Sequence, residues 1–360
     1  MSDNATPGVG PRTSGRDGEA VETAVSTATP PAVTDDLVVP FRLEASGALG
    51  RLARLGCVVD GILKRHDYPD PVSIVLGEAL VLAAILGAGL KNQSRFTLQT
   101  QTDGPINFLV VNFDWPDGLR GYATFDAEHF AQEPEVTGSG NGALLGSGHM
   151  AMTIIPGSDT PGEMGQQYQG IVAMEGQSLI DAAHTYFVQS EQLPTALHVA
   201  VAKHFDGAVE QEPGGPTWRW RAGGIIAQKL TWEGGKKRAE VAPELANDLP
   251  PEWEDDDDWM RTRALASTVE AHELTDPLLS PEQLLFRLFH EEGVRVFEIR
   301  GMAERCSCSR ERIESVLARF PPDEIEEMER EDGDVQVTCE FCGRVYTFDK
   351  IAVAALSGDA

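Results

Sequence analysis

Four of the five cysteines of this chain lie close to its C-terminus, in two short pairs. One serine separates Cys306 from Cys308, and Cys339 and Cys342 follow after thirty further residues. Two such pairs can supply four thiolates to a tetrahedral zinc ion and leave no position open for a substrate. We therefore predict one zinc ion bound by all four. Because most zinc sites place two or more residues between paired cysteines, free or disulfide-bonded thiols remain the alternative.

The residues around these cysteines predict a small module that needs a metal. Alternating apolar residues over 335–348 predict two strands joined at a turn, where Gly343 can adopt a positive φ. Between the pairs, apolar residues at helical spacing predict a helix over 310–319, which two prolines end before an acidic helical piece around Ile325 and Met328. So few apolar residues cannot stabilise a module of about fifty residues alone, so a metal is expected.

Composition limits the classes of partner. The chain has 360 residues, 41% of them hydrophobic, which is enough for one large domain and one or two small ones. Its net charge of -28 disfavours nucleic acid and anionic membranes as partners, since both require a positive surface. Cysteines at metal-ligand spacing favour a reducing compartment, and we expect a cytoplasmic protein. Residues 1–37 are rich in small and polar residues and are expected to form a disordered tail without a targeting signal.

Residues 38–235 alternate between helical and strand patterns. The apolar run over 72–90 approaches membrane-spanning length, but it contains Glu78 and is expected to be a buried helix. Helical spacing predicts helices over 47–66, 73–91 and 178–189. Period-two patterns and Asp-Gly turns predict antiparallel strands over 96–100, 106–113, 119–125, 149–155, 168–174, 193–202 and 218–230. The predicted fold class is α+β, with an antiparallel sheet domain, a helical linker and a small zinc module.

Residues 236–298 are expected to form an acidic and helical linker. Four aspartates over 255–258 cannot pack in a core, which predicts a linker or a solvated face. Ser280, Pro281 and Gln283 have the types expected of an N-cap, a first helical residue and a capping box. An apolar stripe follows, formed by Leu284, Leu285, Leu288 and Phe289. This stripe must pack on a neighbouring helix or on the main domain, unless a regulated event uncovers it. The zinc module is placed at 299–352, before a tail at 353–360.

Motifs for enzymatic chemistry fail on inspection, so a catalytic site is not predicted. His290 and Glu291 lack the second histidine of a metalloprotease helix, and no phosphate-binding loop is present in the sequence. His66, Asp67 and His184 have no nucleophile beside them and are interpreted as structural. Cys57 is interpreted as a small core residue on the apolar side of a helix.

Two rival functions remain from the residues alone. The first is a thiol-disulfide oxidoreductase that uses Cys339 and Cys342, although such a pair normally opens a helix after a strand. The second is a zinc-ribbon regulator that binds nucleic acid, which the acidic balance of the chain opposes. An insulin reduction assay tests the first function, and a salt-dependent DNA-binding titration tests the second.

The stretches around the cysteines, 306–312 and 339–343, are similar to the C-terminal redox switch of the bacterial 33 kDa chaperonin (heat shock protein 33) family, and the sequence resembles that family. Further landmarks occur in order at 66–72, 103–105, 168–170, 190–195 and 287–292. The resemblance extends from about residue 38 to residue 350. The N-terminal tail and the acidic insert over 253–259 depart from the family pattern.

The resemblance implies a chaperone that holds unfolding or oxidatively damaged proteins without ATP. It implies an inactive zinc-bound form and an active form with disulfides Cys306–Cys308 and Cys339–Cys342, Cys57 remaining outside. ATP-dependent refolding chaperones are then expected downstream, with homodimerisation of the oxidised form as a further option. Release of the module is expected to expose apolar surface over residues 245–300. Three arginines near the ligands in sequence either offset the thiolate charge or are solvated: Arg305, Arg310 and Arg344.

Overall fold

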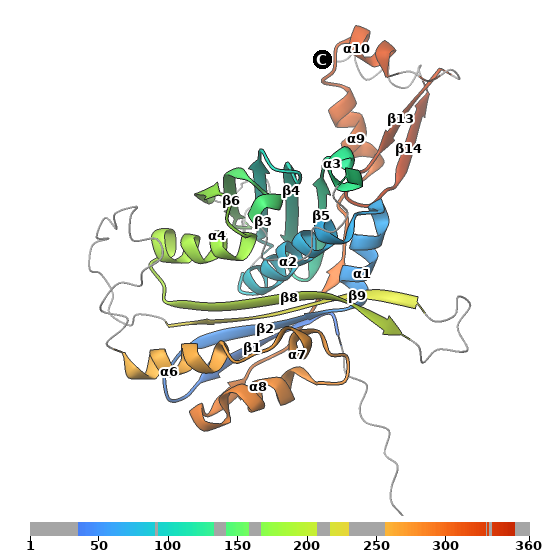
Figure 1. The fold of residues 1–360 in the computed structure, drawn as a ribbon. Helices are drawn as coiled ribbons and strands as arrows, with labels where there is room; N and C mark the ends of the chain where they lie inside the picture. Colours follow the sequence, from blue (N-terminus) through green and yellow to red (C-terminus); the bar gives the residue numbers. More distant parts are fainter. Residues whose placement is uncertain are drawn as a thin grey trace, which may run out of the picture. The chain divides into compact units, whose positions relative to one another are not determined.

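The structure of this protein is a computed structural model, and it describes residues 35–90, 93–132, 142–157, 167–206, 217–229, 256–328, 330 and 333–349. Most of the predicted N-terminal tail, the first part of the predicted linker and the C-terminal tail lie outside these residues. Within them the chain forms three sheets with helices packed against them (Figure 1). The α+β class with antiparallel sheets, predicted from the pattern of turns and strands, is confirmed.

The first sheet contains six of the described strands in the order β10-β1-β2-β9-β8, and β11 also pairs with β1. Their pairings are antiparallel, with Val39 of β1 opposite Leu52 of β2 and Ala53 of β2 opposite Gly224 of β9. The strands are β1 (Leu37–Leu43), β2 (Leu49–Leu55), β8 (Thr195–Asp206), β9 (Thr217–Gln228), β10 (Val294–Val296) and β11 (Arg300–Gly301).

The second sheet contains six described strands in the order β12-β5-β4-β3-β6-β7. It is antiparallel except that β12 runs parallel to β5, with Ala303 opposite Gly118. The strands are β3 (Arg95–Thr102), β4 (Phe108–Asp114), β5 (Gly118–Thr124), β6 (Ser147–Ile155), β7 (Tyr168–Glu175) and β12 (Ala303–Glu304). The strands predicted over 96–100, 106–113, 119–125, 149–155 and 168–174 are confirmed here, and those over 193–202 and 218–230 are confirmed as β8 and β9.

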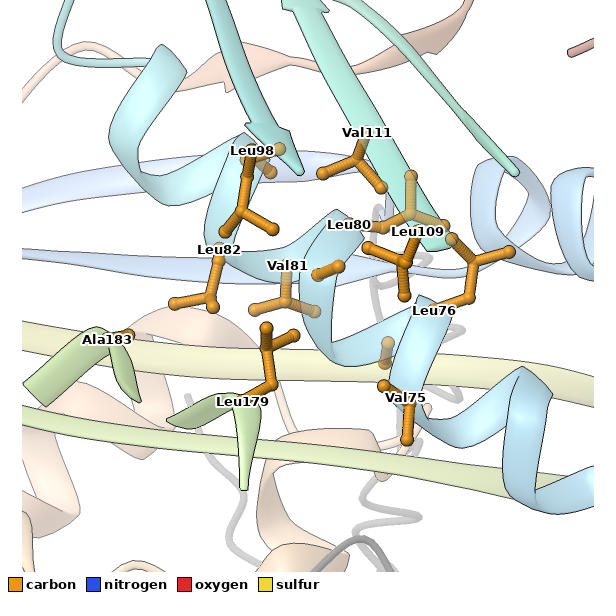
Figure 2. Packing of buried hydrophobic residues seen from close by; sticks show 14 of the residues in the cluster. Val75, Leu76, Leu80, Val81, Leu82, Leu98, Leu109, Val111, Leu179 and Ala183 are labelled. Atoms are coloured by element: carbon orange, nitrogen blue, oxygen red, sulfur yellow. The ribbon is translucent and has the colours of Figure 1, made fainter. Parts of the chain in front are cut away.

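Helix α2 (Asp70–Gly87) lies between the two sheets and forms the centre of the main core. Figure 2 shows Leu76 and Leu80 of this helix beside Leu109 and Val111 of β4. On another side of the helix, Val81 approaches Leu179 of α4 (Leu179–Tyr186). Apolar residues surround the whole helix because it has packing partners on all sides. It is long and apolar enough to cross a membrane, yet 78% of its apolar window is buried inside the protein, as predicted.

The prediction of one helix over 47–66 is wrong. Residues Leu49–Leu55 form β2, and only Cys57–Leu63 form a helix, α1. The three leucines of β2 recur every three residues, which imitates a helical face in the sequence. The strand is favoured because β1 and β9 both pair with it and satisfy its backbone groups on both edges. Strand β1 itself was not predicted.

The prediction that Cys57 is a core residue is also wrong, because the structure places it at the exposed start of α1. Its backbone N–H donates to the carboxylate of Asp36 at 3.0 Å, as do the N–H groups of Gly56 and Val58. Since α1 begins at Cys57 rather than ten residues earlier, the residue sits at a helix end and not on the apolar face.

Three helices of the predicted linker cover the other face of the first sheet: α6 (Asp257–Ala266), α7 (Ala271–Thr275) and α8 (Pro281–Phe289) (Figure 1). The stripe of α8 is buried there, and the ring of Phe289 stacks on Phe41 at 5.7 Å between centroids. The predicted capping box is present, with Ser280 and Gln283 exchanging hydrogen bonds of 3.1 and 3.2 Å. Packing of the stripe on the main domain is therefore confirmed.

The acidic segment is partly a helix start and partly a solvated face. Asp256 caps α6 by accepting from the N–H of Trp259 at 2.9 Å, while Asp257 and Asp258 are exposed. Trp259 itself is 1% exposed and belongs to the same core as Phe289. Asp257 and Asp258 thus form a solvated face, as predicted, although the aromatic residue beside them is a core residue.

The remaining described elements are short. They include α3 (Ala127–Gln132), 3-10 turns at Lys64–His66, Gly142–Leu144 and His290–Glu292, and a π turn at Phe187–Glu191 that continues α4. Ser178 caps α4 by accepting from Asp181 N at 3.1 Å, which confirms the start of the helix predicted over 178–189.

Burial of two histidines predicts a loss of stability in acid. Burial lowers the pKa of His184, whose Nε2 lies 3.3 Å from Leu197 O, and burial together with His184 lowers the pKa of His198. The unfolded chain therefore takes up these protons first, at its ordinary pKa of about 6.5. Their contribution to the unfolding free energy is present above that pH and falls as the pH drops below it. Urea unfolding at pH 7.5 and 5.5 should show a smaller acid loss in His184→Gln than in the parent, and an equal loss would contradict this prediction.

Candidate metal centre

The C-terminal module consists of α9 (Arg310–Leu317), α10 (Pro322–Glu327) and the hairpin of β13 (Asp334–Thr338) and β14 (Val345–Asp349). The predicted helix and hairpin are confirmed. Ser309 caps α9 by accepting from Arg312 N at 3.3 Å. Its buried apolar cluster has four described members, which is too few to stabilise a fold alone: Leu317, Ile325, Val335 and Phe348.

The four cysteines of this module come together. Cys306 and Cys308 lie just before α9, and Cys339 and Cys342 lie in the turn between β13 and β14. All four Sγ atoms lie within 4.8 Å of one another, with 3.7 Å between those of Cys306 and Cys339 and 3.3 Å between those of Cys308 and Cys342. Four sulfurs at about 2.3 Å from a tetrahedral zinc ion would stand about 3.8 Å apart, so this donor set fits zinc.

The turn that carries the second pair has the geometry that its sequence predicts. Gly343 has a φ of +65°, in the left-handed region that a residue with a side chain rarely adopts. Its N–H donates to Cys339 O at 2.7 Å, and the N–H of Cys339 donates to Arg344 O at 2.9 Å. These bonds close the turn, and the thiols of Cys339 and Cys342 then lie close to those of Cys306 and Cys308.

The thiols are not equivalent electrostatically. Burial raises the pKa of Cys308, but hydrogen bonds from the Tyr346 hydroxyl, at 3.2 Å, and from the Cys342 thiol outweigh it and lower the pKa to about 7. Burial raises the pKa of Cys342 to about 12. Cys308 therefore ionises at lower pH than Cys342, and a thiolate is the form that binds metals and reacts with oxidants.

Of the three arginines near the ligands in sequence, Arg344 interacts with the thiols electrostatically. A hydrogen bond with Tyr346, and then the charges of Tyr346, Cys308 and Cys342, raise its pKa. Arg305 forms an ion pair with Asp117 at 2.8 Å. The Arg310 guanidinium lies 4.4 Å from the centre of the Phe348 ring and donates to Thr347 O at 3.0 Å.

Side chains of the main domain also reach the module, and the sequence did not predict them. Arg120 of β5 donates to Ser307 Oγ at 2.8 Å and lies 4.0 Å from Cys306 Sγ. Arg65 donates to Phe341 O at 3.3 Å. The sequence contained one weak signal, because Arg120 and Tyr122 alternate with glycine in a predicted strand and therefore share a face.

The other candidate residues lie outside the two segments that carry the four cysteines. His66 packs on Tyr68 with ring centroids 5.3 Å apart, Asp67 occupies the left-handed turn after it, and His184 lies in α4. These placements fit their interpretation as structural. Cys339 and Cys342 lie in a hairpin turn rather than at the start of a helix, which is not the context of an oxidoreductase pair.

Comparisons with known proteins give a consistent result. A family model described as Hsp33 protein matches residues 36–349. The 33 kDa chaperonin of Caulobacter vibrioides is 40% identical over 318 residues, which cover 88% of this chain and 96% of that protein. The 33 kDa chaperonin of Escherichia coli is 32% identical over 320 residues, 89% of this chain and 94% of that protein.

A solved structure agrees with the fold. The crystal structure of the 33 kDa chaperonin of Thermotoga maritima matches with a TM-score of 0.65 at 20% identity. The match covers 89% of this chain and 98% of that one. At this identity the likeness concerns the fold alone.

Proposed function

Because this chain belongs to the Hsp33 family, we propose that it is a redox-regulated holdase, which binds unfolding and oxidatively damaged proteins without ATP. The observation that carries this proposal is the convergence of four thiols, from segments more than thirty residues apart, in a module with too small a core to fold alone. We propose zinc as the metal, a cytoplasmic location, and transfer of clients to ATP-dependent chaperones. Dimerisation of the oxidised form belongs to the same proposal.

In the reduced state Cys306, Cys308, Cys339 and Cys342 would hold the zinc ion, which supplies a crosslink between the start of α9 and the hairpin. Binding of a structural zinc ion contributes on the order of 10 kcal/mol to the folding free energy of a small metal-binding module. The buried cluster around Leu317 and Phe348 cannot replace that contribution. The module should therefore remain folded only while the thiolates hold the metal.

Oxidation by hydrogen peroxide would convert the thiolate ligands into disulfides, which no longer bind the metal. The Cys308 thiolate attacks hydrogen peroxide, its sulfur is oxidised to sulfenic acid, and the cleaved O–O bond releases one water after protonation. A neighbouring thiolate then attacks that sulfur, forms the disulfide and displaces the second water. Two thiols thus give their electrons to one peroxide, and two such events consume all four ligands.

The family resemblance favours the neighbour disulfides Cys306–Cys308 and Cys339–Cys342. The two short sulfur distances instead join Cys306 to Cys339 and Cys308 to Cys342. We expect peptide mapping of the peroxide-treated protein to find mainly the neighbour pairs, with Cys57 reduced. Predominance of bonds between the two segments would contradict the proposal, because such bonds would preserve the long-range link that oxidation is meant to cut.

The linker connects the module to the main domain. After α8 the chain pairs with β1 through β10 and β11, and then with β5 through β12, whose last residue, Glu304, lies two positions before Cys306. We propose that loss of the module's fold loosens these short strands and the helices before them. Hydrogen exchange over residues 256–300 should therefore be faster in the oxidised protein than in the zinc-bound one. Unchanged exchange together with active suppression would assign client binding to the main domain instead.

The direct test of function is light scattering from a thermally unfolding client without nucleotide. Peroxide-treated protein should suppress scattering, and reduced zinc-bound protein should suppress it much less. Reduction and addition of zinc should restore the inactive state. Equal suppression by both forms would remove redox regulation from the proposal, and no suppression by either form would contradict the holdase activity itself.

A further inference from the structure

Phe341 is one of the two residues between Cys339 and Cys342 in the hairpin turn, and side chains of the main domain surround it. The Arg120 guanidinium lies 4.3 Å from the centre of its ring. The ring of Tyr122 meets it edge-on with centroids 5.2 Å apart. Arg65 donates to its carbonyl oxygen at 3.3 Å. The residue is thus contacted on its face, its edge and its backbone by side chains more than two hundred positions earlier.

Arg120 is held in place from behind. Its Nε donates to Asn112 Oδ1 at 3.1 Å, and Asn112 Nδ2 donates to Thr97 Oγ1 at 2.7 Å. This chain of bonds crosses three adjacent strands, β5, β4 and β3, and Asn112 is 6% exposed. The free end of the guanidinium donates to Ser307 Oγ. Because hydrogen bonds within the second sheet already fix the Arg120 rotamer, little side-chain entropy is lost when Phe341 packs against the guanidinium.

The charge of this surface suits the module. Arg65 forms an ion pair with Glu304, and Arg120 approaches Cys306 Sγ at 4.0 Å. Four thiolates around one divalent cation carry a net charge of about −2, so the Arg120 guanidinium beside Cys306 favours the metal-loaded module. Attraction between a guanidinium and an aromatic face adds to this, and it strengthens where water is excluded.

We propose that Arg65, Arg120 and Tyr122 form a docking surface that recognises Phe341 and thereby contributes to zinc affinity. This inference rests on the zinc site of the proposed function. Phe341 lies between two ligands, so its position is fixed when both hold the metal. Docking and metal binding therefore support each other, and by linkage each strengthens the other by the same factor. Loss of the metal frees Phe341 and undocks the module from β5.

A double-mutant cycle on zinc affinity tests the proposal in the full-length reduced protein. Competition with a chromogenic chelator should show that Arg120→Ala weakens zinc affinity about tenfold. In a Phe341→Leu background, which keeps apolar volume but removes the aromatic face, the same change should cost less than about threefold. An equal cost in the two backgrounds would overturn the proposal, because Arg120 would then not act through Phe341.

Arg95→Ala is the matched control, since Arg95 is also a half-buried arginine of the second sheet but pairs with Asp114. It should leave zinc affinity within twofold, and an Arg120→Ala value no weaker than this control would equally overturn the proposal. Hydrogen exchange over 334–349 gives a second readout, expected to rise in Arg120→Ala and not in Arg95→Ala. Both variants are compared in the reduced, zinc-bound state, because the module is expected to be folded only then. A chain that binds no zinc would contradict the proposed function, whereas equal exchange in the two zinc-bound variants would overturn the docking surface alone.

Discussion

Replacing Cys308 with serine is expected to reduce the zinc content of the purified protein from one ion per chain to nearly none in the presence of a competing chelator. Cys308 is the thiol whose pKa is lowered to about 7, and it lies against Cys342 and the Tyr346 hydroxyl. A serine hydroxyl at this position stays protonated and cannot serve as a soft anionic ligand. Atomic absorption or native mass spectrometry measures the loss directly.

The same substitution should unfold the module without unfolding the main domain. Metal binding is expected to contribute on the order of 10 kcal/mol, far more than four buried apolar residues can replace. Hydrogen exchange should become fast over 310–317 and 334–349 while α2 stays protected. Cys57→Ser is the control, because that thiol is exposed at the start of α1 and should leave both zinc content and exchange unchanged. Full zinc content in Cys308→Ser would refute the four-ligand site.

Phe289→Ala is expected to destabilise the packing of the linker helices on the first sheet by about 3–5 kcal/mol. The side chain is fully buried and stacks on Phe41, and it shares its core with Trp259 and Leu274 of the two preceding helices. Truncation leaves a cavity, because the sheet and the three helices around it are too closely packed to move in and fill it. Urea unfolding of the reduced, zinc-bound protein should show this loss as a lower midpoint or as a separate early transition.

Phe286→Ala provides a closely matched control on the same helix. The residue is 63% exposed, so the substitution should change the unfolding free energy by less than about 0.5 kcal/mol. If the linker is the part that opens on activation, Phe289→Ala should also lower the peroxide dose needed for suppression of client scattering. Equal stability of the two variants would show that α8 does not hold the linker on the sheet.

A buried arginine supplies a polar part of the same attachment. Arg54 of β2 is 1% exposed and donates to the backbone oxygens of Asp276 and Leu279, the latter at 2.9 Å. Arg221 of β9 donates to Thr275 O at 2.8 Å. Thr275 is the last residue of α7, and Asp276 and Leu279 lie between α7 and α8. The core strands therefore supply donors to carbonyls at and beyond the end of a helix, where helical partners are missing. The attachment of the linker is therefore both apolar and hydrogen-bonded.

Local features were predictable where the signal lies within a few residues. The capping box at Ser280 and Gln283, the turn at Gly343 and the two cysteine pairs each depend on the chemistry of adjacent positions. Period-two strands joined by Asp-Gly turns predicted most of the second sheet for the same reason. The clustering of the four cysteines was predictable because a tetrahedral metal that takes soft anionic ligands is the simplest use for two such pairs.

Where two local interpretations were equally good, the neighbours in space decided. The leucines of residues 49–55 fit a helical face, but β1 and β9 pair with this segment on both edges and make it a central strand. That error also placed Cys57 in the core, whereas it lies at an exposed helix start. Trp259 stands among aspartates in sequence, yet the first sheet and α8 bury it.

The sequence by itself determined that this chain contains two cysteine pairs able to supply four thiols to a metal, an amphipathic helix at 281–289 and an α+β domain, since each follows from residue type and short-range spacing. Only the tertiary structure decided which side chains of the main domain meet the metal module. Arg65, Arg120 and Tyr122 are brought to Phe341 by strand pairing and helix packing, and no local periodicity encodes such a meeting. Contacts between distant segments depend on how whole layers stack, and this is settled by burial of the shared core around α2.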